Sequence, residues 1–396
     1  MHDTKLLKIT KIIIVIILFS LSILSLINIE SKEEYIIPNL DQPINYLKTG
    51  NLDANPIFID AEATGENAHN WTWAVSQVWC NGSGTEVDPY RISYLNINGM
   101  GVNNCIEIRN SQSDYFMIDH CIFSNAGNAD PHKFAANIFI NNSKYGTILS
   151  NQILGASSDL ALGMYIEDCL HVSIQSNNIS DNRFGGIQLS HSFASNISNN
   201  NILNNHYMGI SVQEGSQTIN IWNNLIIQNY DGIGISEGSY SSIYNNSVID
   251  NYIHGIICVD CYNIEIASNT VRLNDYVGIY IQESRTINVI YNTIKQNEYG
   301  IIFKLSDTNH IYENVITHNN YYPMWLYSSN NNRILGNIIT QNKETFTQID
   351  CVGNELIENY IFNKPEEQFL TVLITGTVFL TLLALLLIRR WRKAER

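Results

Sequence analysis

A repeat of 22 or 23 residues constrains the fold of this chain more than any other feature of its sequence. Glycine marks the repeat at Gly163, Gly186, Gly209, Gly232, Gly255, Gly278 and Gly300. A first asparagine column follows at Asn151, Asn177, Asn200, Asn224, Asn246, Asn269, Asn292, Asn314, Asn337 and Asn359. A second column lies at Asn182, Asn205, Asn229, Asn251, Asn274, Asn297, Asn319 and Asn342. A fixed period of this kind indicates structural units that bury their apolar sides only by stacking on one another.

Aliphatic residues keep the same period and alternate with other residues. One follows each glycine by one position and another by three, and further ones flank the first asparagine column. Each repeat therefore holds three short alternating runs separated by Asn, Gly and Ser, which predicts three strands joined by corners. With no helical period between them, such strands predict an all-β, single-stranded parallel β-helix with three strands per coil. The prediction requires one continuous internal file, formed by Ile210, Ile233, Ile256 and Ile279.

The asparagine columns are expected to lie at the corners of the coils. Asparagine tolerates the left-handed backbone conformation that a sharp corner needs. Its side-chain amide can also bond to the same amide one coil along. We therefore predict asparagine ladders with left-handed asparagines.

The repeat unit reads N-x-(I/V)-x-x-N-x-(Y/F)-x-G-I-x-(I/V/L) and fits best over residues 174–342. It resembles the right-handed parallel β-helix repeat family, which includes pectate-lyase-like, NosD-like and carbohydrate-binding or sugar-hydrolase proteins. The resemblance implies a right-handed β-helix over residues 104–364, preceded by a cap and lead-in strands over residues 32–103. It leaves function open, because this scaffold carries lyases, hydrolases, epimerases, adhesins and structural proteins.

Both ends of the chain are hydrophobic. Basic residues precede the apolar run "IIIVIILFSLSILSLIN", so residues 1–31 are predicted to be a secretory signal or an uncleaved membrane anchor. Residues 369–388 carry no charge over twenty positions, enough for a transmembrane helix. The basic tail 389–396 follows and is expected in the cytoplasm, which puts the β-helix outside the cell on a single-pass or two-pass membrane protein.

The charge balance narrows the range of partners. Lys and Arg number 22 against 37 Asp and Glu, and the formal net charge is −15. Nucleic acid is excluded as a partner, because binding it needs clustered cations that this sequence lacks. Cations and neutral or basic partners are favoured instead. Seven Cys in an extracellular protein would allow disulfides, with at least one thiol left unpaired.

An acidic column follows the glycines by five positions. It contains Asp168, His191, Glu214, Glu237, Asp260 and Glu283, and ends at Leu305. Strict alternation would point these side chains inward, which a carboxylate resists, so the chain is predicted to turn here and leave them along one edge. Three interpretations stay open: a solvated corner, a catalytic carboxylate pair, or a Ca²⁺ stripe at Glu214, Glu237, Asp260 and Glu283.

Aromatic residues form a further column just before the glycines, at Phe184, Tyr207, Tyr230, Tyr252, Tyr276, Tyr299 and Tyr321. Stacked corner residues are one interpretation. A glycan-binding face is the other, with Tyr207, Tyr230, Tyr276 and Tyr299 as the candidate carbohydrate-binding residues. The tryptophan-rich segment "NWTWAVSQVW", residues 70–79, is predicted to cap the open hydrophobic end of the stack.

Three short motifs offer weaker indications. "DPH" at residues 130–132 is similar to a motif of mannuronan-epimerase-like β-helices. His254-Gly255 lacks the first glycine of the G-H-G signature of polygalacturonase-like proteins. NosD-like naming implies copper handling; Cys258 and Cys261 have CxxC spacing, but Cys258 falls in an interior column.

The sequence thus predicts a membrane-tethered, extracytoplasmic β-helix that serves as a surface binding or structural module for carbohydrate. Cell-surface or environmental glycans are the expected partners, with the membrane contacted through residues 369–388. A polysaccharide lyase or hydrolase that uses acids of the 168–283 column is the alternative. Copper handling is the second alternative.

Overall fold

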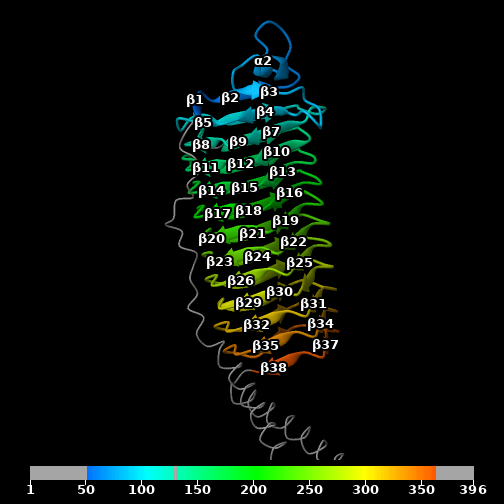
Figure 1. Cartoon of the computed structure of the whole chain (residues 1–396). Coiled ribbons are helices and arrows are strands. Elements are labelled where there is room, and N and C mark those ends of the chain that lie inside the picture. Colours follow the sequence, from blue (N-terminus) through cyan, green and yellow to red (C-terminus); the bar gives the residue numbers. More distant parts are fainter. Residues whose placement is uncertain (1–50, 129, 131–132, 363–396) are drawn as a thin grey trace, which may run out of the picture. The chain divides into compact units, whose positions relative to one another are not determined.

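The computed structural model describes residues 51–128, 130 and 133–362, and these form the predicted all-β, right-handed parallel β-helix (Figure 1). Each coil contributes one strand to each of three sheets. Sheets A and C have 13 strands and sheet B has 12. In the described part, no helix has the length and apolar composition needed to cross a membrane. The predicted segments 1–31 and 369–388 both lie outside the described residues.

The strands of each sheet follow one another in coil order. Sheet A contains β1 (Leu52–Ala54), β5 (Leu95–Asn98), β8 (Ile122–Ser124), β11 (Gln152–Leu154), β14 (Asn178–Ser180), β17 (Asn201–Leu203), β20 (Leu225–Ile227), β23 (Ser247–Ile249), β26 (Thr270–Arg272), β29 (Thr293–Lys295), β32 (Val315–Thr317), β35 (Ile338–Thr340) and β38 (Tyr360–Phe362). Sheet B contains β2 (Ile57–Asp60), β6 (Ile106–Arg109), β9 (Ala135–Asn141), β12 (Ala161–Glu167), β15 (Ile187–Ser190), β18 (Met208–Gln213), β21 (Asp231–Ser236), β24 (His254–Val259), β27 (Val277–Gln282), β30 (Tyr299–Lys304), β33 (Met324–Tyr327) and β36 (Thr347–Ile349). Sheet C contains β3 (Cys80–Asn81), β4 (Tyr90–Ser93), β7 (Phe116–Asp119), β10 (Gly146–Leu149), β13 (Ser173–Gln175), β16 (Asn196–Ser198), β19 (Asn220–Trp222), β22 (Ser242–Tyr244), β25 (Glu265–Ala267), β28 (Asn288–Ile290), β31 (His310–Tyr312), β34 (Arg333–Leu335) and β37 (Glu355–Ile357). All neighbouring strands pair in parallel except β3 and β4, which are antiparallel.

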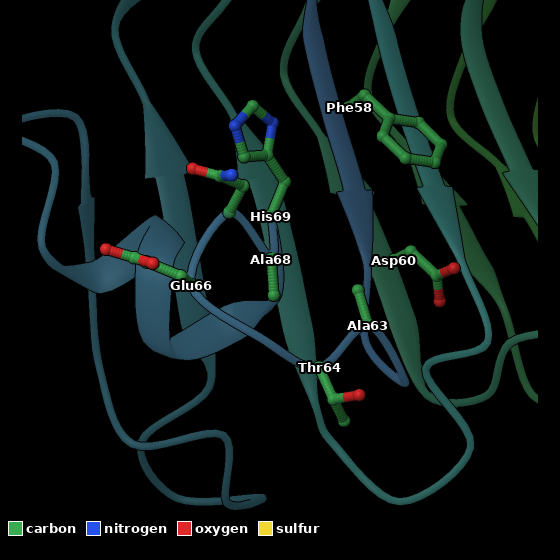
Figure 2. Close-up of a pocket in the computed structure, with 8 residues that line it drawn as sticks. Phe58, Asp60, Ala63, Thr64, Glu66, Ala68 and His69 are labelled. Carbon is green, nitrogen blue, oxygen red and sulfur yellow. The ribbon is translucent and has the colours of Figure 1, made fainter.

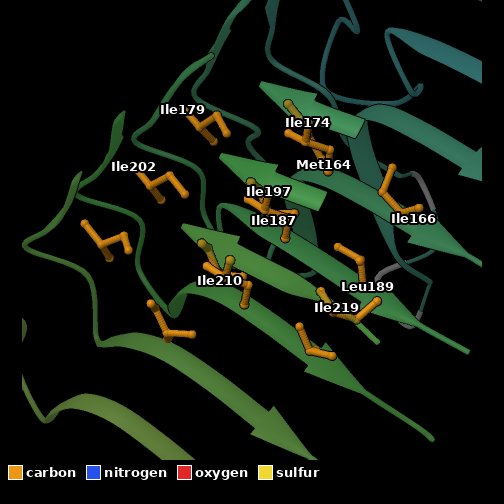
Figure 3. Close-up of a cluster of buried hydrophobic side chains, with 14 of the residues drawn as sticks. Met164, Ile166, Ile174, Ile179, Ile187, Leu189, Ile197, Ile202, Ile210 and Ile219 are labelled. Carbon is orange, nitrogen blue, oxygen red and sulfur yellow. The ribbon is translucent and has the colours of Figure 1, made fainter. Parts of the chain in front are cut away.

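The core is a set of aliphatic files that run along the stack (Figure 3). In sheet B, Ile210 pairs with Ile233, Ile233 with Ile256, and Ile256 with Ile279. All four are fully buried, so the continuous internal file predicted from the sequence is confirmed. The alternation of the strands explains this result, since every second side chain faces inward and stacks on its equivalent one coil away.

The corners are made by single residues in the left-handed conformation. The acidic column supplies one such corner: Glu214, Glu237 and Asp260 have φ of 55° each. The prediction that the ladder asparagines themselves adopt this conformation is wrong. The residue before each of them does so, as with Asn245 (φ 55°) before Asn246. The reason is geometric: the left-handed residue reverses the chain direction, and the next side chain then points into the coil.

The ladder asparagines are hydrogen-bonded in both columns, and all but the half-buried Asn359 are buried. In the first column, from Asn151 to Asn337, each backbone N–H donates to the Oδ1 of the asparagine one coil later, as in Asn224 to Asn246 at 3.0 Å and Asn246 to Asn269 at 2.9 Å. The side-chain Nδ2 donates to that same oxygen at 3.0 Å in both pairs. The predicted amide ladder is therefore confirmed. It satisfies backbone groups that each corner would otherwise leave unpaired inside the protein.

The helix α2 (Trp71–Val75) lies at the N-terminal end of the stack (Figure 1). Trp71 is buried, stacks on Tyr90 at 4.6 Å, and donates its indole N–H to Ser111 Oγ at 2.9 Å. Its side chain belongs to the hydrophobic core. The first strands of all three sheets, β1 to β5, lie in the segment 52–98, which the sequence assigned to cap and lead-in strands.

All seven cysteines lie in the described part of the chain, and none forms a disulfide. Six are buried and one is half-buried. Burial raises the pKa of the thiols of Cys105, Cys121 and Cys169 to about 12. These thiols are therefore protonated at neutral pH and pack as small apolar residues.

Candidate functional site

Aromatic side chains line the starting edge of the sheet B strands. Phe184 stacks on Tyr207 with ring centroids 4.9 Å apart, and Tyr207 stacks on Tyr230 at 5.9 Å. Further along, Tyr276 meets Tyr299 edge to face at 5.2 Å. These rings, from Phe184 to Tyr299, are called the aromatic file below. Tyr230 and Tyr276 are 44% and 38% exposed, so part of each ring is accessible to a ligand.

One predicted member of the aromatic file is replaced. The backbone N–H of Ile253 donates to the carbonyl of Tyr230, and the N–H of Tyr276 donates to the carbonyl of Ile253. Ile253 therefore occupies the position between the two tyrosines, and Tyr252 lies one residue earlier. Ile253 lies two positions before Gly255, as Tyr207, Tyr230 and Tyr276 lie two positions before their glycines. The sequence prediction took Tyr252 because it is the aromatic residue nearest to that position.

The aromatic surface widens beyond Tyr299. Tyr299 stacks on Tyr321 at 5.4 Å and on Trp325 at 6.0 Å, and Trp325 lies on the outer side of β33. Sequence reasoning missed Trp325, although its alternation with the buried Met324 and Leu326 marks it as outward-facing. The result is a broad aromatic surface toward the C-terminal half of sheet B.

An aspartate–histidine pair lies beside the aromatic file. Asp231 Oδ1 accepts a hydrogen bond from His254 Nδ1 at 2.8 Å and another from the His254 backbone N–H at 3.0 Å. Their side chains are 7% and 15% exposed, respectively. A carboxylate that is ionised can only accept, so in that form Nδ1 supplies the proton of this hydrogen bond. The His254 ring also stacks on Tyr280 at 5.2 Å.

The Asp231–His254 pair was not predicted, although the sequence contained a signal for it. The two residues are 23 positions apart, which is one coil, so they lie side by side on β21 and β24. The negative charge of Asp231 also reaches the aromatic file. Burial, followed by the charges of Asp231 and Tyr230, raises the pKa of Tyr207.

The acidic column lies at the other end of the same strands. Glu214, Glu237, Asp260 and Glu283 are exposed corner residues that immediately follow β18, β21, β24 and β27. This confirms the predicted turn and edge; we call these four residues the acidic edge. One coil earlier, His191 Nδ1 lies 3.4 Å from a carboxylate oxygen of Glu214.

The proposed Ca²⁺ stripe gains no support from the side-chain positions. Among residues 51–128, 130 and 133–362, no group of three or more His, Cys, Asp or Glu side chains is placed to hold a metal ion. The carboxylates point into solvent from separate corners. Cation binding at Glu214, Glu237, Asp260 and Glu283 stays a prediction.

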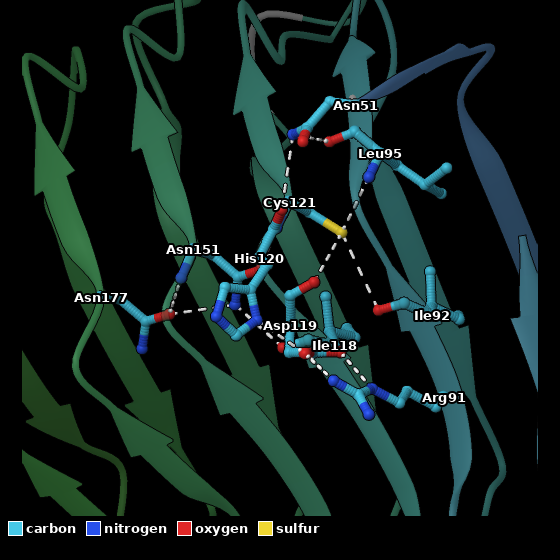
Figure 4. Close-up of polar contacts among 10 residues, drawn as sticks. All are labelled: Asn51, Arg91, Ile92, Leu95, Ile118, Asp119, His120, Cys121, Asn151 and Asn177. Atoms are coloured by element: carbon cyan, nitrogen blue, oxygen red, sulfur yellow. Dashed lines mark hydrogen bonds and ion pairs between the residues drawn. The ribbon is translucent and has the colours of Figure 1, made fainter. Parts of the chain in front are cut away.

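A second buried carboxylate lies near the N-terminal end of the stack, on β7 of sheet C (Figure 4). The Asp119 side chain is 0% exposed and accepts from Arg91 Nε at 2.9 Å, from Arg91 Nη2 at 2.6 Å and from His120 Nδ1 at 2.7 Å. Burial raises the pKa of Asp119, but the hydrogen bonds and charges of Arg91 and His120 together lower it by more, so the net shift is downward. All three of these bonds come from the chain itself, so this carboxylate serves the fold.

An open hollow of about 520 Å³ lies near α2 (Figure 2). Its lining residues are Phe58, Asp60, Ala63, Thr64, Glu66, Asn67, Ala68 and His69. His69, which lines the hollow, stacks on Trp73 of α2 with ring centroids 4.0 Å apart. No residue predicted from the sequence as a site lies here. Two residues of the "DPH" motif, 131 and 132, lie outside the described residues.

A comparison with models of protein families identifies the family to which this chain belongs. A family model described as periplasmic copper-binding protein (NosD) matches residues 80–255 and 248–369. The chain belongs to the NosD family. The match covers the regular coils, so the resemblance drawn from the repeat unit is confirmed. A search of curated proteins found no match.

The copper in the NosD description does not fit the described residues. Copper sites need thiolate, thioether or imidazole ligands that converge. Cys258 and Cys261 are the closest to such a set, but both are buried in the core. The hydrogen bond between the two thiols, together with burial, raises the pKa of Cys258, while the same bond lowers the pKa of Cys261. Cys258 therefore keeps its proton, whereas a metal ligand must lose it. No step through copper is assigned to this NosD-family chain.

Solved structures similar to this NosD-family chain share its fold. The crystal structure of the periplasmic alginate epimerase AlgG has 16% sequence identity and a TM-score of 0.55, covering 77% of this chain and 84% of that one. A double mutant of AlgG has 16% identity and a TM-score of 0.56, covering 69% and 78%. The A-module of the mannuronan C-5 epimerase AlgE6 of Azotobacter vinelandii has 12% identity and a TM-score of 0.44, covering 70% and 89%. At these identities the likeness to the two AlgG structures establishes the parallel β-helix and nothing finer.

Proposed function

We propose that this NosD-family chain is a surface-displayed β-helix that binds carbohydrate along the outer face of sheet B. The observation that carries the proposal is the aromatic file, in which Tyr207, Tyr230, Tyr276 and Tyr299 present exposed or half-exposed rings. Exposed tyrosines offer a flat apolar surface to a sugar ring together with a polar hydroxyl. Coils repeat at about 4.8 Å, close to the length of one sugar unit, so an extended glycan can meet one coil per unit.

The relatives support a carbohydrate role without specifying it. AlgG is an alginate epimerase by its description, and its β-helix is similar to this one. Polysaccharides are long, and the outer face of a parallel β-helix offers a correspondingly long surface. Cell-surface or environmental glycans are therefore the partners that we propose.

The proposed location is extracytoplasmic, with the chain tethered to a cell membrane. Its support is the sequence of residues 369–388, which are free of charge, and the basic tail 389–396 that follows. Residues 1–31 would act as the export signal or as a second anchor. In this arrangement residues 32–103 cap the stack and residues 104–364 form its regular coils. If residues 1–31 are a cleaved signal, deletion of residues 369–388 should release the chain from the membrane fraction of expressing cells. If they are a second anchor, release should require deletion of both segments.

A second candidate function is a carbohydrate-active enzyme, and the Asp231–His254 pair is the observation that favours it. A carboxylate that orients a histidine tautomer is the arrangement found in general acid–base catalysis. Here His254 Nε2 would exchange the proton and Asp231 would hold the ring. An enzyme predicts glycan cleavage or modification that is lost in His254→Gln, measured by product release from acidic and neutral polysaccharides. A binding module predicts no product.

The carbohydrate proposal is tested by removing the two most exposed rings of the aromatic file. Tyr230→Ala combined with Tyr276→Ala should weaken binding to the best ligand of a glycan panel at least about tenfold, given about 1 kcal/mol per ring. Replacement of the same tyrosines by Phe keeps the rings and should keep most of the affinity. The measurement is isothermal titration of the full chain in mild detergent.

The matched control uses two exposed tyrosines away from the aromatic file. Tyr240 and Tyr262 lie one coil apart, with ring centroids 5.7 Å apart, at the corner between sheets B and C. Their double alanine variant should bind as the unchanged protein does. Equal losses in both double variants, or binding to no glycan at all, would refute the proposed function.

A further inference from the structure

The C-terminal end of the stack leaves residues of the internal files partly uncovered. Strands β36, β37 and β38 come last in their sheets, so no described strand pairs with their free edges (Figure 1). Leu356 on β37 and Ile361 on β38 continue the files of Ile334 and Ile339. Ile334 and Ile339 are 1% exposed, whereas Leu356 and Ile361 are 44% and 39% exposed. This end therefore has an apolar centre that no described coil covers.

Exposed aliphatic side chains gather in the coils around this end. Among the described residues from 104 to 314, Leu305 is the one large aliphatic side chain that is exposed. The last coils expose six, at Val315, Ile338, Ile349, Val352, Leu356 and Ile361. Tyr360 adds an aromatic ring that is 60% exposed. Exposed apolar residues that gather in one place indicate an interaction surface.

The sequence after the last strand indicates a lipid surface as the partner. Phe362 ends β38, and residues 363–368 separate it from the uncharged run 369–388. Six residues span at most about 20 Å when fully extended. If residues 369–388 cross the membrane as proposed above, the apolar end of the stack is held within that distance of the bilayer.

The charges around this end argue against a second copy of the chain as the partner. Four exposed carboxylates lie on the last coil, at Glu344, Asp350, Glu355 and Glu358. The cations beside them are the exposed Lys343 and, one coil earlier, Arg333, which lies 3.5 Å from Glu355. Two such ends face to face would bring like charges together, and charges on edge strands oppose pairing with another sheet edge.

We propose that the C-terminal end of the stack contacts the membrane surface at the level of the lipid headgroups. The proposal rests on the membrane tether proposed above and adds a second contact, made by the β-helix itself. The free strand edges limit the depth, because backbone N–H and C=O groups find partners among water and headgroups but none among the acyl chains. Tyr360 suits the same level, where a tyrosine ring meets apolar and its hydroxyl polar surroundings. The carboxylates of the last coil favour neutral over anionic lipid.

The test places a fluorescent label at the end of the stack in the full chain, reconstituted in phosphatidylcholine vesicles that carry nitroxide lipids. The label is attached to Tyr360→Cys in a Cys351→Ser background, since the other six cysteines are buried and serine occupies the position equivalent to Cys351 one coil earlier, at Ser329. The matched control is Ser247→Cys, in the same outward column of sheet A. It lies five coils earlier, about 24 Å away. Quenching at residue 360 should exceed quenching at residue 247 at least about twofold, because interfacial contact reaches only about 5–10 Å.

A longer linker separates docking from tethering alone. An insert of about twelve Gly and Ser residues after Gln368 adds about 20 Å of flexible reach. A docked end should stay quenched, whereas an end held only by the short linker would lose most of its quenching. In this long-linker chain, Val352→Asp should reduce quenching at least about twofold, because it places a charge on a side chain that is 74% exposed and part of the contact. Leu305→Asp, at an exposed corner two coils before the last, is the control and should have no effect.

The outcomes distinguish the docked end from the tether on which it depends. Equal quenching at residues 360 and 247, or loss of quenching with the longer linker, would overturn the proposal and leave the tether standing. A chain that does not enter the vesicle fraction would overturn both. Vesicles that also contain phosphatidylglycerol should give weaker quenching of the long-linker chain, and stronger quenching there would contradict the preference for neutral lipid. A dimer in detergent that Val352→Asp dissociates would identify a second copy as the partner and overturn the lipid contact.

Discussion

The asparagine ladder allows a stability prediction that the structure makes quantitative. Asn246 is 1% exposed and lies in the middle of the first column. Its Oδ1 accepts from the backbone N–H and the Nδ2 of Asn224, each at 3.0 Å. Its Nδ2 donates to the carbonyl oxygens of Ile221 and Tyr244 at 2.9 and 3.1 Å. The substitution Asn246→Ala removes all of these bonds at once.

The cost follows from the groups left behind. The Asn224 backbone N–H and the Ile221 carbonyl lose these partners inside the stack, and each unsatisfied buried group costs about 1–3 kcal/mol. We therefore expect Asn246→Ala to lower the free energy of unfolding by about 2–6 kcal/mol. Because coils stabilise only their neighbours, the loss is expected to appear first as unfolding of the coils around β22 and β23.

The assay is urea unfolding of the full chain in mild detergent, followed by circular dichroism. Asn220→Ala serves as the control, since Asn220 is half-buried on sheet C and donates one side-chain bond to Asn196 at 3.1 Å. That variant should lose at most about 1 kcal/mol. If Asn246→Ala were no less stable than Asn220→Ala, the ladder would make no net contribution and the argument from buried unpaired groups would fail.

Two further predictions concern carboxylates. The pKa of Asp119 is lowered in the folded state, so its contribution to stability is present above the unfolded pKa near 4 and is lost as pH falls through the folded value. Asp119→Asn should flatten that acid dependence in urea midpoints measured across pH, and an unchanged acid dependence would contradict it. Glu237→Asn with Asp260→Asn should leave Tm unchanged or raise it, because like charges one coil apart repel by about 1 kcal/mol in water. A Tm of the unchanged protein that rises with Ca²⁺, and no longer does so in this variant, would instead support the cation stripe.

The fold was predictable from the sequence because the same residue types recur at a fixed spacing along the chain. Ile210, Ile233 and Ile256 are fully buried in one file, and that file follows directly from their equal spacing. The NosD family follows from the same repeat, which the family model also matches. Strand pairing in a solenoid is easier to predict than in other β-proteins, because each repeat contacts only the repeats next to it in the sequence.

The backbone conformation of individual corner residues was harder to predict from the sequence. Asparagine favours both the left-handed conformation and amide stacking, and the sequence does not say which role a given asparagine takes. The structure gives the two roles to neighbours, with Asn245 left-handed and Asn246 in the ladder. Tyr252 was predicted in the aromatic file because it is aromatic, although the offset of two residues from the glycine places Ile253 there.

The candidate site was only partly predictable. Tyr207, Tyr230, Tyr276 and Tyr299 lie in the aromatic file at one edge of sheet B, and the acidic edge lies at the other. The sequence alone did not show that these two sets of residues border the same outer face, because that conclusion depends on the register of the sheet B strands. The Asp231–His254 pair joins two unlike residues one coil apart, which the columns of like residues do not reveal.

The ladder bonds all point in the same direction, which gives the stack a polarity. In every pair from Asn151 to Asn359, the earlier coil supplies the N–H and the later coil supplies the oxygen. A ribosome releases the earlier coil first, with its donors still open. Each newly synthesised coil then brings the acceptors that close the coil before it, so the domain can assemble by vectorial growth from its N-terminal end, one winding at a time.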